Sequence, residues 1–491
     1  PNPTPRVLII GGGLAGMAAA AALEQAGCRV TLVEARHALG GRAGSFSDPE
    51  SGQLLDSSQH VLLGCCVNLL DLYRRLGVAD KIHWQRQVHF LKVPAAAAHP
   101  SQQRAQPVRR YDLWGLGALP APLHMGLAFA GFGLLSVGER LALVRAMLAM
   151  LRLGKAGRED LEQLSFGVWL AQHNQPAALT HKFYEPVLIS ALNIPCERAS
   201  AKYAIQVFQD ALLGHNRGYV VGLAACPLEE LYGQLPVGDV RLNSRVAGLL
   251  WDGLRVSGVK LQNGEELAAD AVVLATNYPS VIKWVADLPI AATHPDERLR
   301  GLREIQSVPI LGAHLWFDRP VMTEPALAIV EETSGLGGGL QWLFRKDDTG
   351  CAVQGVISAA TEYVDRPRDE TVAQLARQVV QIWSARAAGK GEATPQLVRG
   401  SIVIEKRATF APLPGVDKLR PLHGPGTVGV RGLYLAGDYT KTDWPATMEG
   451  AVRSGYLAAE AVLADAEGQP HHRFLVEDLP VQWPARWLGL E

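Results

Sequence analysis

The sequence lacks the features that mark several protein classes: paired cysteines, a net charge and clustered metal ligands. Its six cysteines include no Cys-x-x-Cys pair, and the adjacent Cys65 and Cys66 cannot easily bridge, so we expect reduced thiols. His471-His472 has no carboxylate or cysteine nearby at ligand spacing, so no metal is expected and the pair is predicted to be solvated. The net charge of −1 gives no basic excess, which argues against a nucleic-acid partner.

The sequence also lacks an uninterrupted apolar segment long enough to cross a bilayer. Residues 113–138 carry no formal charge, but Pro120 and Pro122 interrupt them, and residues 123–137 alone are too short. The segment favours a helix that lines an apolar substrate tunnel and touches a membrane surface, with a core helix or a true span as alternatives. Because a predicted strand begins close to the first residue, no signal peptide is expected. We therefore expect a cytoplasmic protein, with peripheral contact to the inner face of the membrane left open.

The strongest pattern that is present is a β-α-β unit at the start of the chain. Residues 6–10 predict a buried strand, residues 17–25 an alanine-rich helix and residues 29–34 a second strand. The turn reads Gly11-Gly12-Gly13-Leu14-Ala15-Gly16, which matches the Gly-x-Gly-x-x-Gly pattern of dinucleotide cradles. With an acid at the end of the second strand, this unit predicts nucleotide binding.

Each glycine of this turn has a physical role in such a cradle. Gly11 permits the tight turn, Gly13 lets the backbone approach a pyrophosphate, and Gly16 lets the helix pack close to the strand. The helix N-terminus directs unpaired N–H groups at the phosphates, and Glu34 can accept hydrogen bonds from ribose hydroxyls. The contacts predicted in this unit are Gly11, Gly13, Leu14, Ala15, Gly16, Glu34 and Ala35.

A second glycine pair favours a flavin over a nicotinamide. Gly40-Gly41-Arg42-Ala43 follows the ribose acid, and Arg42 can offer a fixed fork of donors to phosphate or to the flavin end of the cofactor. This arrangement resembles the extended fingerprint of FAD-dependent oxidoreductases of the amine oxidase and phytoene desaturase superfamily. The resemblance implies FAD as the cofactor and adds Gly40, Gly41, Arg42 and Ala43 to its contacts.

A motif near the C-terminus extends this resemblance. Residues 432–438 predict a strand ending in Gly437-Asp438, and residues 447–465 predict a helix. In carotenoid desaturases and their relatives the aspartate contacts the ribityl or pyrophosphate portion. The helix N-terminus faces the flavin pyrimidine ring, where its partial positive charge stabilises reduced flavin. The resemblance therefore assigns Gly437, Asp438, Thr447, Met448 and Ala451 to FAD, together with Val246 and Ala275 from the middle of the chain.

These patterns predict an α/β protein of two domains, because 491 residues exceed one simple core. By resemblance, one is a Rossmann-like FAD-binding domain of the glutathione-reductase-2 type, assembled from discontinuous segments, and the other is an α+β substrate domain. In the latter, Ser136 and Glu139 predict a capping box, and the next helix carries one apolar stripe: Leu141, Val144, Met147, Leu148 and Leu151. We expect the FAD-binding domain at residues 1–88, 223–289 and 401–468, the substrate domain at 89–222 and 290–400, and a C-terminal tail at 469–491.

The likeness narrows to one family at several segments, and it runs over nearly the whole chain. The segments that resemble the hydroxysqualene dehydroxylases, also described as squalene-associated FAD-dependent desaturases, are residues 55–66 (LDSSQHVLLGCC) with 69–77 (LLDLYRRLG), 191–195 (ALNIP) with 199–201 (ASA), and 406–410 (KRATF). This implies reductive dehydroxylation of hydroxysqualene to squalene, in squalene and hopanoid biosynthesis, with hydride from reduced FAD. The electron donor that reduces FAD is not identified by the sequence.

An acid should assist this reaction, because hydroxide is a poor leaving group. By motif alignment Gln59 and His60 contact the flavin, and His60 is the candidate acid because imidazole titrates near neutral pH. The alternative is that both residues only hydrogen-bond the flavin or the backbone. Three other functions stay open: a carotenoid (phytoene-type) desaturase, a non-catalytic FAD-containing lipid-binding protein, and an amine oxidase acting on a polar substrate.

Overall fold

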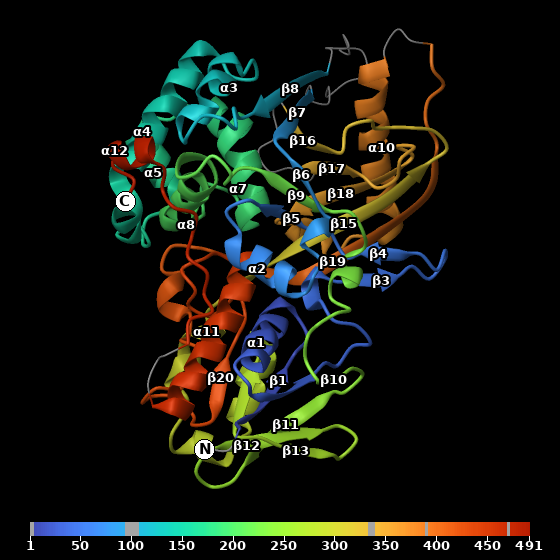
Figure 1. Cartoon of the computed structure of the whole chain (residues 1–491). Helices are drawn as coiled ribbons and strands as arrows, with labels where there is room; N and C mark the ends of the chain where they lie inside the picture. The colour runs from blue at the N-terminus through green and yellow to red at the C-terminus, as the bar shows by residue number, and fades with distance from the viewer. Residues whose placement is uncertain (1–3, 94–107, 332–338, 388–390, 469–471) are drawn as a thin grey trace.

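A five-stranded parallel sheet forms the centre of the lower part of the molecule (Figure 1). The computed structural model describes residues 4–93, 108–331, 339–387, 391–468 and 472–491. The strand order is β10–β2–β1–β14–β20, and every neighbouring pair is parallel. The strands are β1 (Arg6–Ile10), β2 (Arg29–Val33), β10 (Asp239–Arg241), β14 (Ala271–Leu274) and β20 (Leu433–Leu435). The sheet thus joins the beginning, the middle and the end of the chain.

The strands of this sheet are apolar on both faces, and helices cover one of them. Val7 and Ile9 of β1 share a core with α1 (Leu14–Gln25), α2 (Val67–Arg75) and α11 (Met448–Glu467), while the intervening residues of β1 face the opposite core. The alanine-rich sequence of α1 suits this position, since nearly all of its residues are buried.

The opposite face is covered by a small antiparallel sheet and one helix. The sheet contains β11 (Val246–Trp251), β12 (Val256–Leu261) and β13 (Glu266–Ala268), and the helix is α9 (Tyr278–Ala286). Apolar residues of β12 pack into the same core as the outward-facing residues of β1 and β14. Both faces of the parallel sheet are therefore buried, as is usual for parallel sheets.

A seven-stranded sheet forms the upper right of the molecule (Figure 1). Its order is β19–β15–β18–β17–β16–β7–β8, and α10 (Arg368–Ala387) packs on β15 and β19. The strands are β7 (Gln87–Val93), β8 (Arg109–Trp114), β15 (Ser307–Phe317), β16 (Ala326–Glu331), β17 (Trp342–Arg345), β18 (Ala352–Ser358) and β19 (Leu397–Phe410). Two small sheets lie near the junction with the lower part: β3 (Ser45–Ser47) with β4 (Leu54–Asp56), and β5 (Val61–Leu63) with β9 (Val221–Ala224) and β6 (Ile82–Gln85).

A group of helices forms the upper left. They are α3 (Gly126–Gly131), α4 (Val137–Glu159), α5 (Phe166–Gln172), α6 (Ala177–Leu179), α7 (Glu185–Leu192) and α8 (Ala201–Phe208), with π-helical turns at Thr180–Tyr184 and Gln209–Leu213. The predicted capping box is present: the Glu139 N–H donates to Ser136 Oγ, and the Ser136 N–H donates to Glu139 Oε2. The predicted stripe is only partly buried, because Met147 and Leu151 lie in the core whereas Leu141 and Val144 are exposed.

The C-terminal segment is packed against the rest of the chain. Ala485 and Leu490 are fully buried, and α12 (Trp483–Trp487) lies beside α4 (Figure 1). The Lys155 N–H donates to the Glu491 carbonyl oxygen at 2.8 Å. Residues 472–491 are thus part of the folded molecule rather than a solvated tail; His471 lies outside the described residues.

The structure bears on three further expectations. The domain boundaries predicted after residues 88 and 400 fall within β7 and β19, so the division into domains stays a prediction. None of the six cysteines, all of which lie in the described ranges, forms a disulfide. Within the described ranges, no helix combines the length and apolar composition needed to cross a bilayer.

Candidate active site

The glycine turn between β1 and α1 lies at the carboxyl end of the parallel strands. Gly11 has a φ of +113°, and a Cβ there would lie 2.5 Å from the carbonyl oxygen of Ala275. A Cβ on Gly16 would lie 1.9 Å from the Gly11 carbonyl oxygen and 3.2 Å from Ala275 Cβ. Neither position accepts a side chain, and Ala275, the residue after β14, contacts both.

Gly13 is the open position of the turn. A Cβ there would meet no atom closer than Gly41 Cα at 4.0 Å. Gly13 is also the N-cap of α1, and no side chain among the described residues caps the helix, so the first-turn N–H groups at Leu14 and Ala15 have no side-chain acceptor. Open space beside an uncapped helix N-terminus is what a pyrophosphate requires, so the turn fits the phosphates of FAD.

Glu34 holds the turn in shape. Its Oε2 accepts the Gly12 N–H at 2.7 Å and its Oε1 accepts the Arg36 N–H at 2.7 Å. Each carboxylate oxygen keeps a further lone pair, so a contact with ribose is compatible with these bonds and stays a prediction. The Ser244 N–H donates to the Glu34 carbonyl oxygen at 2.9 Å, which brings the start of β11 to this acid. The two neighbouring predicted contacts are Ala35, which is exposed, and Val246, which begins β11.

The second glycine pair lies directly against the first turn. Gly40 and Gly41 have φ values of +109° and +60°, and the Gly40 N–H donates to the Gly12 carbonyl oxygen at 2.8 Å. A Cβ on Gly41 would lie 3.1 Å from Gly13 Cα. Ala43 is buried behind the pair. The two glycine motifs, separated in sequence by the helix and strand between them, therefore form one backbone surface.

Arg42 reaches across the site to Asp438. Its two terminal nitrogens donate to the two carboxylate oxygens at 3.0 and 2.6 Å, and the first also donates to the Ala408 carbonyl oxygen at 2.7 Å. The Asp438 side chain is only 6% exposed, whereas that of Arg42 is 43% exposed. This bidentate pair joins the second glycine motif to the C-terminal motif, which the sequence could only place in the same site by resemblance.

The C-terminal motif is tied to the first turn of α11. The Gly437 N–H donates to Ser454 Oγ at 2.7 Å, and Ser454 Oγ donates to the Ala451 carbonyl oxygen at 2.6 Å. Thr447 is the N-cap, and its Oγ1 accepts the Gly450 N–H at 3.0 Å. Met448 and Ala451 therefore occupy the first turn, as the resemblance requires.

Gln59 and His60 belong to a polar group beside Arg42. We call it the Lys346 cluster, consisting of Asp56, Gln59, His60 and Lys346. The Lys346 ammonium donates to Gln59 Oε1 at 3.1 Å and lies 3.7 Å from Asp56 Oδ2. Ser57 Oγ donates to the Arg42 carbonyl oxygen at 3.0 Å, which fixes this segment against the second glycine motif.

The surroundings of His60 oppose its protonation. Burial lowers the pKa of His60 below its ordinary value, and the charges of Arg42 and Lys346 lower it further, against the opposing effects of the Ser58 carbonyl and Asp56. The lowered pKa favours the neutral form of the His60 ring at pH 7. The predicted acid role of His60 is thus not favoured by its surroundings.

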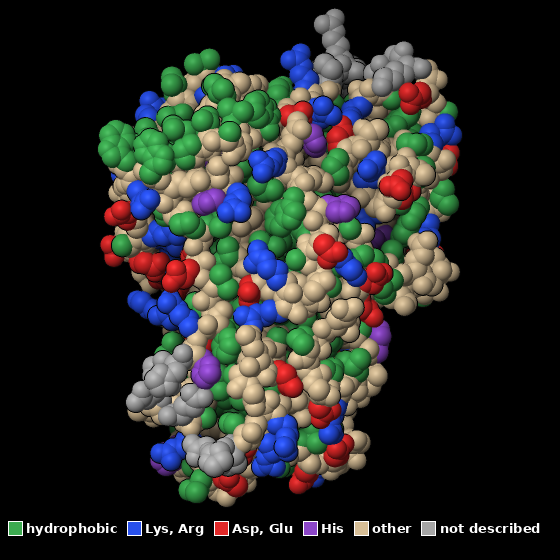
Figure 2. All heavy atoms as spheres, viewed as in Figure 1, with side chains coloured by type: hydrophobic (Ala, Val, Ile, Leu, Met, Phe, Trp, Pro, Cys, Tyr) green, Lys and Arg blue, Asp and Glu red, His purple; other side chains and the backbone are tan. Residues whose placement is uncertain are grey.

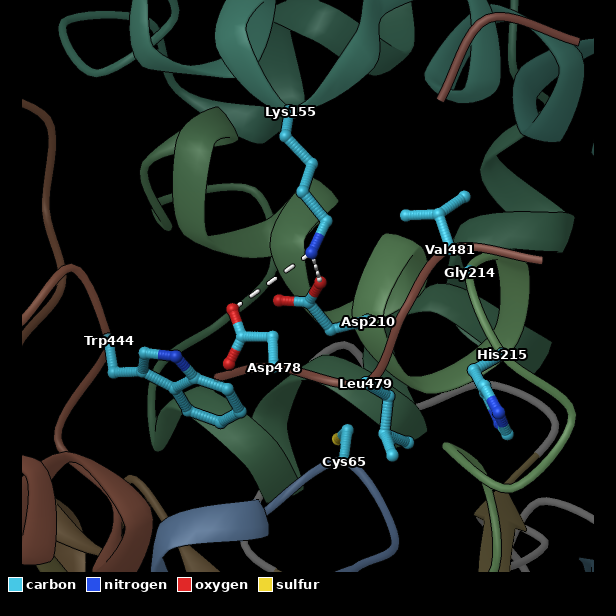
Figure 3. Close-up of a pocket in the computed structure, with 9 residues that line it drawn as sticks. All are labelled: Cys65, Lys155, Asp210, Gly214, His215, Trp444, Asp478, Leu479 and Val481. Atoms are coloured by element: carbon cyan, nitrogen blue, oxygen red, sulfur yellow. Dashed lines mark ion pairs between the residues drawn. The ribbon is translucent and has the colours of Figure 1, made fainter. Parts of the chain in front are cut away.

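A cavity of about 300 Å³ lies between α7 and the seven-stranded sheet, where Ile189, Ile329 and Ile357 supply apolar walls. A second cavity, of about 10 Å³, is lined by residues that include Cys65, Lys155 and Trp444 and has room for roughly one water molecule. In Figure 3 the Lys155 ammonium points between Asp210 and Asp478, at 3.2 and 4.0 Å. The second cavity is therefore a charged junction and is too small for a substrate.

Sequence reasoning missed two residues of the site. Arg420 is buried and donates to the Asp438 carbonyl oxygen at 3.1 Å and to Thr442 Oγ1 at 3.0 Å. Lys346 lies in the run Arg345-Lys346-Asp347-Asp348, which is typical of a solvated loop. No local motif marks either residue; the distant partner segments alone give them their roles.

Comparisons with known proteins bear on this architecture. The chain matches the flavin containing amine oxidoreductase family over residues 14–463. It is 31% identical over 472 residues to hydroxysqualene dehydroxylase of Rhodopseudomonas palustris, covering 93% of this chain and 98% of that protein. It is 24% identical over 481 residues to 15-cis-phytoene desaturase of Synechococcus elongatus, covering 94% and 96%.

Solved structures share the fold at low sequence identity. An oxidoreductase of Methanosarcina mazei aligns with a TM-score of 0.65 at 15% identity, covering 93% of this chain and 99% of the other. Cyclohexylamine oxidase of Brevibacterium oxydans aligns with a TM-score of 0.62 at 17% identity, covering 95% and 100%. These likenesses confirm the predicted α/β fold. Because the family match spans most of the chain, the protein belongs to the flavin containing amine oxidoreductase family and is an FAD-dependent oxidoreductase.

Proposed function

We propose that the chain is a hydroxysqualene dehydroxylase, which reduces hydroxysqualene to squalene with loss of water, in squalene and hopanoid biosynthesis. The observation that carries the proposal is the 31% identity to the Rhodopseudomonas palustris enzyme across 98% of its length. The cyanobacterial phytoene desaturase is 24% identical over a similar span.

Contacts between two of the family-like segments support the proposal. Asn193 Nδ2 donates to Thr409 Oγ1 at 2.8 Å, which joins residues 191–195 to residues 406–410. Asn193 Oδ1 accepts the Ala359 N–H at 2.7 Å, beside the larger cavity that Ala359 helps to line. Asn193 has a φ of +57°, a conformation that asparagine tolerates better than most residues. These two segments thus meet beside the cavity and at β19.

The chain's own residues have defined tasks in such a reaction. FAD, when bound, supplies hydride to the substrate. The two glycine motifs and the α1 N-terminus would hold its phosphates, and Asp438 and the first turn of α11 would hold the rest. The protein must also bind an apolar chain, exclude water and deliver a proton to the leaving hydroxyl. We assign proton delivery to the Lys346 cluster, with Lys346 in place of His60 as the donor.

Anaerobic turnover tests the reaction. Purified holoprotein, photoreduced and mixed with hydroxysqualene, is expected to form squalene while the flavin absorbance of the oxidised state returns. Oxidised protein is expected to form none, because the carbon that loses hydroxyl gains hydride. Two outcomes would contradict the assignment. One is consumption of hydroxysqualene without formation of squalene, and the other is a flavin whose absorbance does not change when a competent reductant is added.

Substitutions in the Lys346 cluster test the proton donor. Lys346→Met should lower kcat by about 10²–10⁴-fold, the usual contribution of general acid catalysis, while flavin absorbance is retained. Lys346→Arg should fail as well, because a guanidinium keeps its proton. Unchanged kcat in His60→Ala would show that His60 is not the acid. Rescue by Lys346→Arg would reduce Lys346 to a positioning residue.

A carotenoid desaturase is the second candidate, because phytoene desaturases of plants and cyanobacteria are 24–26% identical over at least 94% of this chain. Such an enzyme removes hydride from its substrate, so it needs oxidised rather than reduced flavin. Incubation of the oxidised holoprotein with phytoene separates the two. New conjugated double bonds, seen by their visible absorbance, would favour the desaturase.

A further inference from the structure

Exposed apolar side chains gather on one end of the molecule. Figure 2 shows hydrophobic side chains over the upper left, where Figure 1 places α3, α4 and α12. Leu127 is 65% exposed, Val137 69% and Trp487 84%. We call this set the α3–α4–α12 surface; it consists of Leu123, Leu127, Val137, Leu141, Val144, Trp483 and Trp487.

Contacts hold the three helices of this surface together. The Arg140 side chain donates to the Leu135 carbonyl oxygen at 2.9 Å and to the Ala130 carbonyl oxygen, which fixes the start of α4 against the end of α3. Gln482, the N-cap of α12, accepts the Ala121 N–H at 2.6 Å. A Cβ on Gly489 would lie 3.1 Å from Arg152 Cα, so the segment after α12 lies on the second half of α4. The exposed side chains therefore belong to one rigid face.

The α4 helix has a second apolar stripe, which no part of the described chain covers. Val137, Leu141 and Val144 follow one another at intervals of four and three residues, while the buried stripe runs through Leu143 and Met147. A helix that folds only into its own protein places polar residues on the solvent side. An apolar outer stripe on a well-capped helix indicates a partner that is itself apolar.

The charges around this surface are mainly basic. Of the two acids in α4, Glu139 is buried and accepts Lys182 Nζ at 2.7 Å, and Glu159, the last residue of the helix, pairs with Lys202 Nζ at 2.5 Å. Glu491, after α12, is exposed. The arginines of the same face are partly or fully exposed: Arg140, Arg145, Arg152 and Arg486. Long arginine side chains can extend beside an apolar surface and keep their charged heads at a polar boundary. Tryptophan beside arginine on an apolar helix face is the composition of helices that lie in a membrane interface.

We propose that the α3–α4–α12 surface docks on an anionic lipid bilayer, with the leucine, valine and tryptophan side chains in the interface and the arginines at the lipid phosphates. A second copy of this chain fits less well. A two-fold contact would set the same basic rim against itself, with like charges facing each other. An anionic lipid surface instead attracts each arginine.

The docking surface adjoins the larger cavity. The Phe129 ring of α3 contacts the Phe183 ring at 5.6 Å, in the π-helical turn that also contributes His181 to the cavity wall. Lys182 of the same turn pairs with Glu139 of α4. A membrane-bound orientation would therefore bring this cavity close to the bilayer. This last step rests on the lipid substrate proposed above, whereas docking itself does not.

Vesicle sedimentation with the holoprotein tests the docking. We expect binding to phosphatidylglycerol vesicles, weaker binding to phosphatidylcholine vesicles, and release by high salt. The double variant Leu141→Ser/Trp487→Ser should lose at least tenfold in affinity for phosphatidylglycerol. The affinity of Arg145→Gln for phosphatidylglycerol vesicles should fall about fivefold at low salt and much less at high salt, because one arginine contributes one charge contact. Leu254→Ser is the matched control, since Leu254 is 78% exposed in the turn between β11 and β12.

Three outcomes would overturn the docking proposal. They are absence of binding to phosphatidylglycerol vesicles, equal loss of binding in the Leu254→Ser control, and a wild-type dimer in light scattering that becomes monomeric in the double variant. The last would identify the face as a contact between copies. Squalene formation from detergent-dispersed hydroxysqualene should be unchanged in the double variant, so failure of docking and failure of the proposed reaction remain distinguishable.

Discussion

Asp438 is held by two arginines that come from different ends of the chain. Its carboxylate accepts hydrogen bonds from the two terminal nitrogens of Arg42, and its carbonyl oxygen accepts a hydrogen bond from Arg420. Because the Asp438 side chain is almost fully buried, its charge needs such a partner. The pair therefore sets the orientation of Asp438 independently of any bound group, and it binds the two halves of the proposed FAD site to each other.

Asp438→Asn tests this pair. An amide removes the charge and one acceptor from the fork, and a hydrogen bond to a charged group contributes about 1.5–3 kcal/mol. We expect FAD affinity to fall about 10- to 100-fold, measured by titrating apoprotein with FAD. Asp252→Asn is the control, because Asp252 pairs with Arg255 on an exposed turn remote from the glycine motifs. Unchanged FAD affinity in Asp438→Asn would show that the pair is dispensable for the cofactor.

At the residue scale, sequence reasoning succeeded where a short motif fixes the backbone. A Cβ on Gly16 would meet the Gly11 carbonyl oxygen, which is the tight packing expected within one β-α-β unit. The close approach at Gly11 is to Ala275, which lies outside that unit. Lys346 and Arg420 could not be found in this way. Their partners lie far away in sequence, and only the folded chain brings Gln59 to the first and Asp438 to the second.

The pairing of α1 with α11 is the element-scale contact that positions the cofactor motifs. A Cβ on Gly455 would lie 2.2 Å from the Ala15 carbonyl oxygen and 2.8 Å from Ala18 Cβ, so the two helices touch through their backbones. Because α11 begins at the C-terminal motif and α1 at the glycine turn, this close approach fixes the distance between their two N-termini.

Gly455→Ala tests that approach. The added methyl meets backbone atoms that cannot rotate away, so α11 must shift, at a cost of about 1–3 kcal/mol. We expect the variant to unfold at a lower Tm and to release FAD at a lower temperature than wild type. Flavin fluorescence, recorded during heating, measures both. Gly138→Ala in α4 is the control: a Cβ there meets nothing within 4 Å, and the substitution should be neutral or stabilising by up to about 1 kcal/mol. Equal Tm values for Gly455→Ala and wild type would contradict the argument.

Element prediction from sequence had a limit that α4 illustrates. Its apolar periodicity and capping box predicted the helix correctly, and Met147 and Leu151 are buried. Periodicity identifies an apolar side chain, however, and not the surface that covers it. Leu141 and Val144 belong to the outer stripe, so a single apolar pattern conceals two faces with different partners.

For the whole molecule, buried histidines set a pH dependence of stability. Burial lowers the pKa of His124 and of His314 to about 4 and that of His423 to about 3. In the unfolded chain each titrates near 6.5, so below that pH the unfolded state binds protons that the folded state does not. Stability contributed by these groups is present above pH 6.5 and is lost as pH falls toward 4, by on the order of 1 kcal/mol per pH unit for each histidine.

The substitution His124→Phe isolates the contribution of one buried histidine to this pH dependence. His124 is fully buried beside the Tyr219 ring, and neither ring nitrogen has a hydrogen-bond partner among the described residues. An apolar ring avoids that desolvation cost, so we expect a stability gain that is larger at pH 5 than at pH 8. Denaturant unfolding at both pH values measures it. A gain that is the same at both would mean that His124 does not titrate in the expected range.

The parallel sheet also governs when the protein can fold during synthesis. The strand β1 is synthesised more than 250 residues before its neighbour β14, and β20 ends only at Leu435. Until then the nascent chain carries an open, apolar strand edge, which is prone to association. Translation speed and chaperone supply, rather than the final stability of the fold, should therefore limit the yield of this protein from a heterologous host.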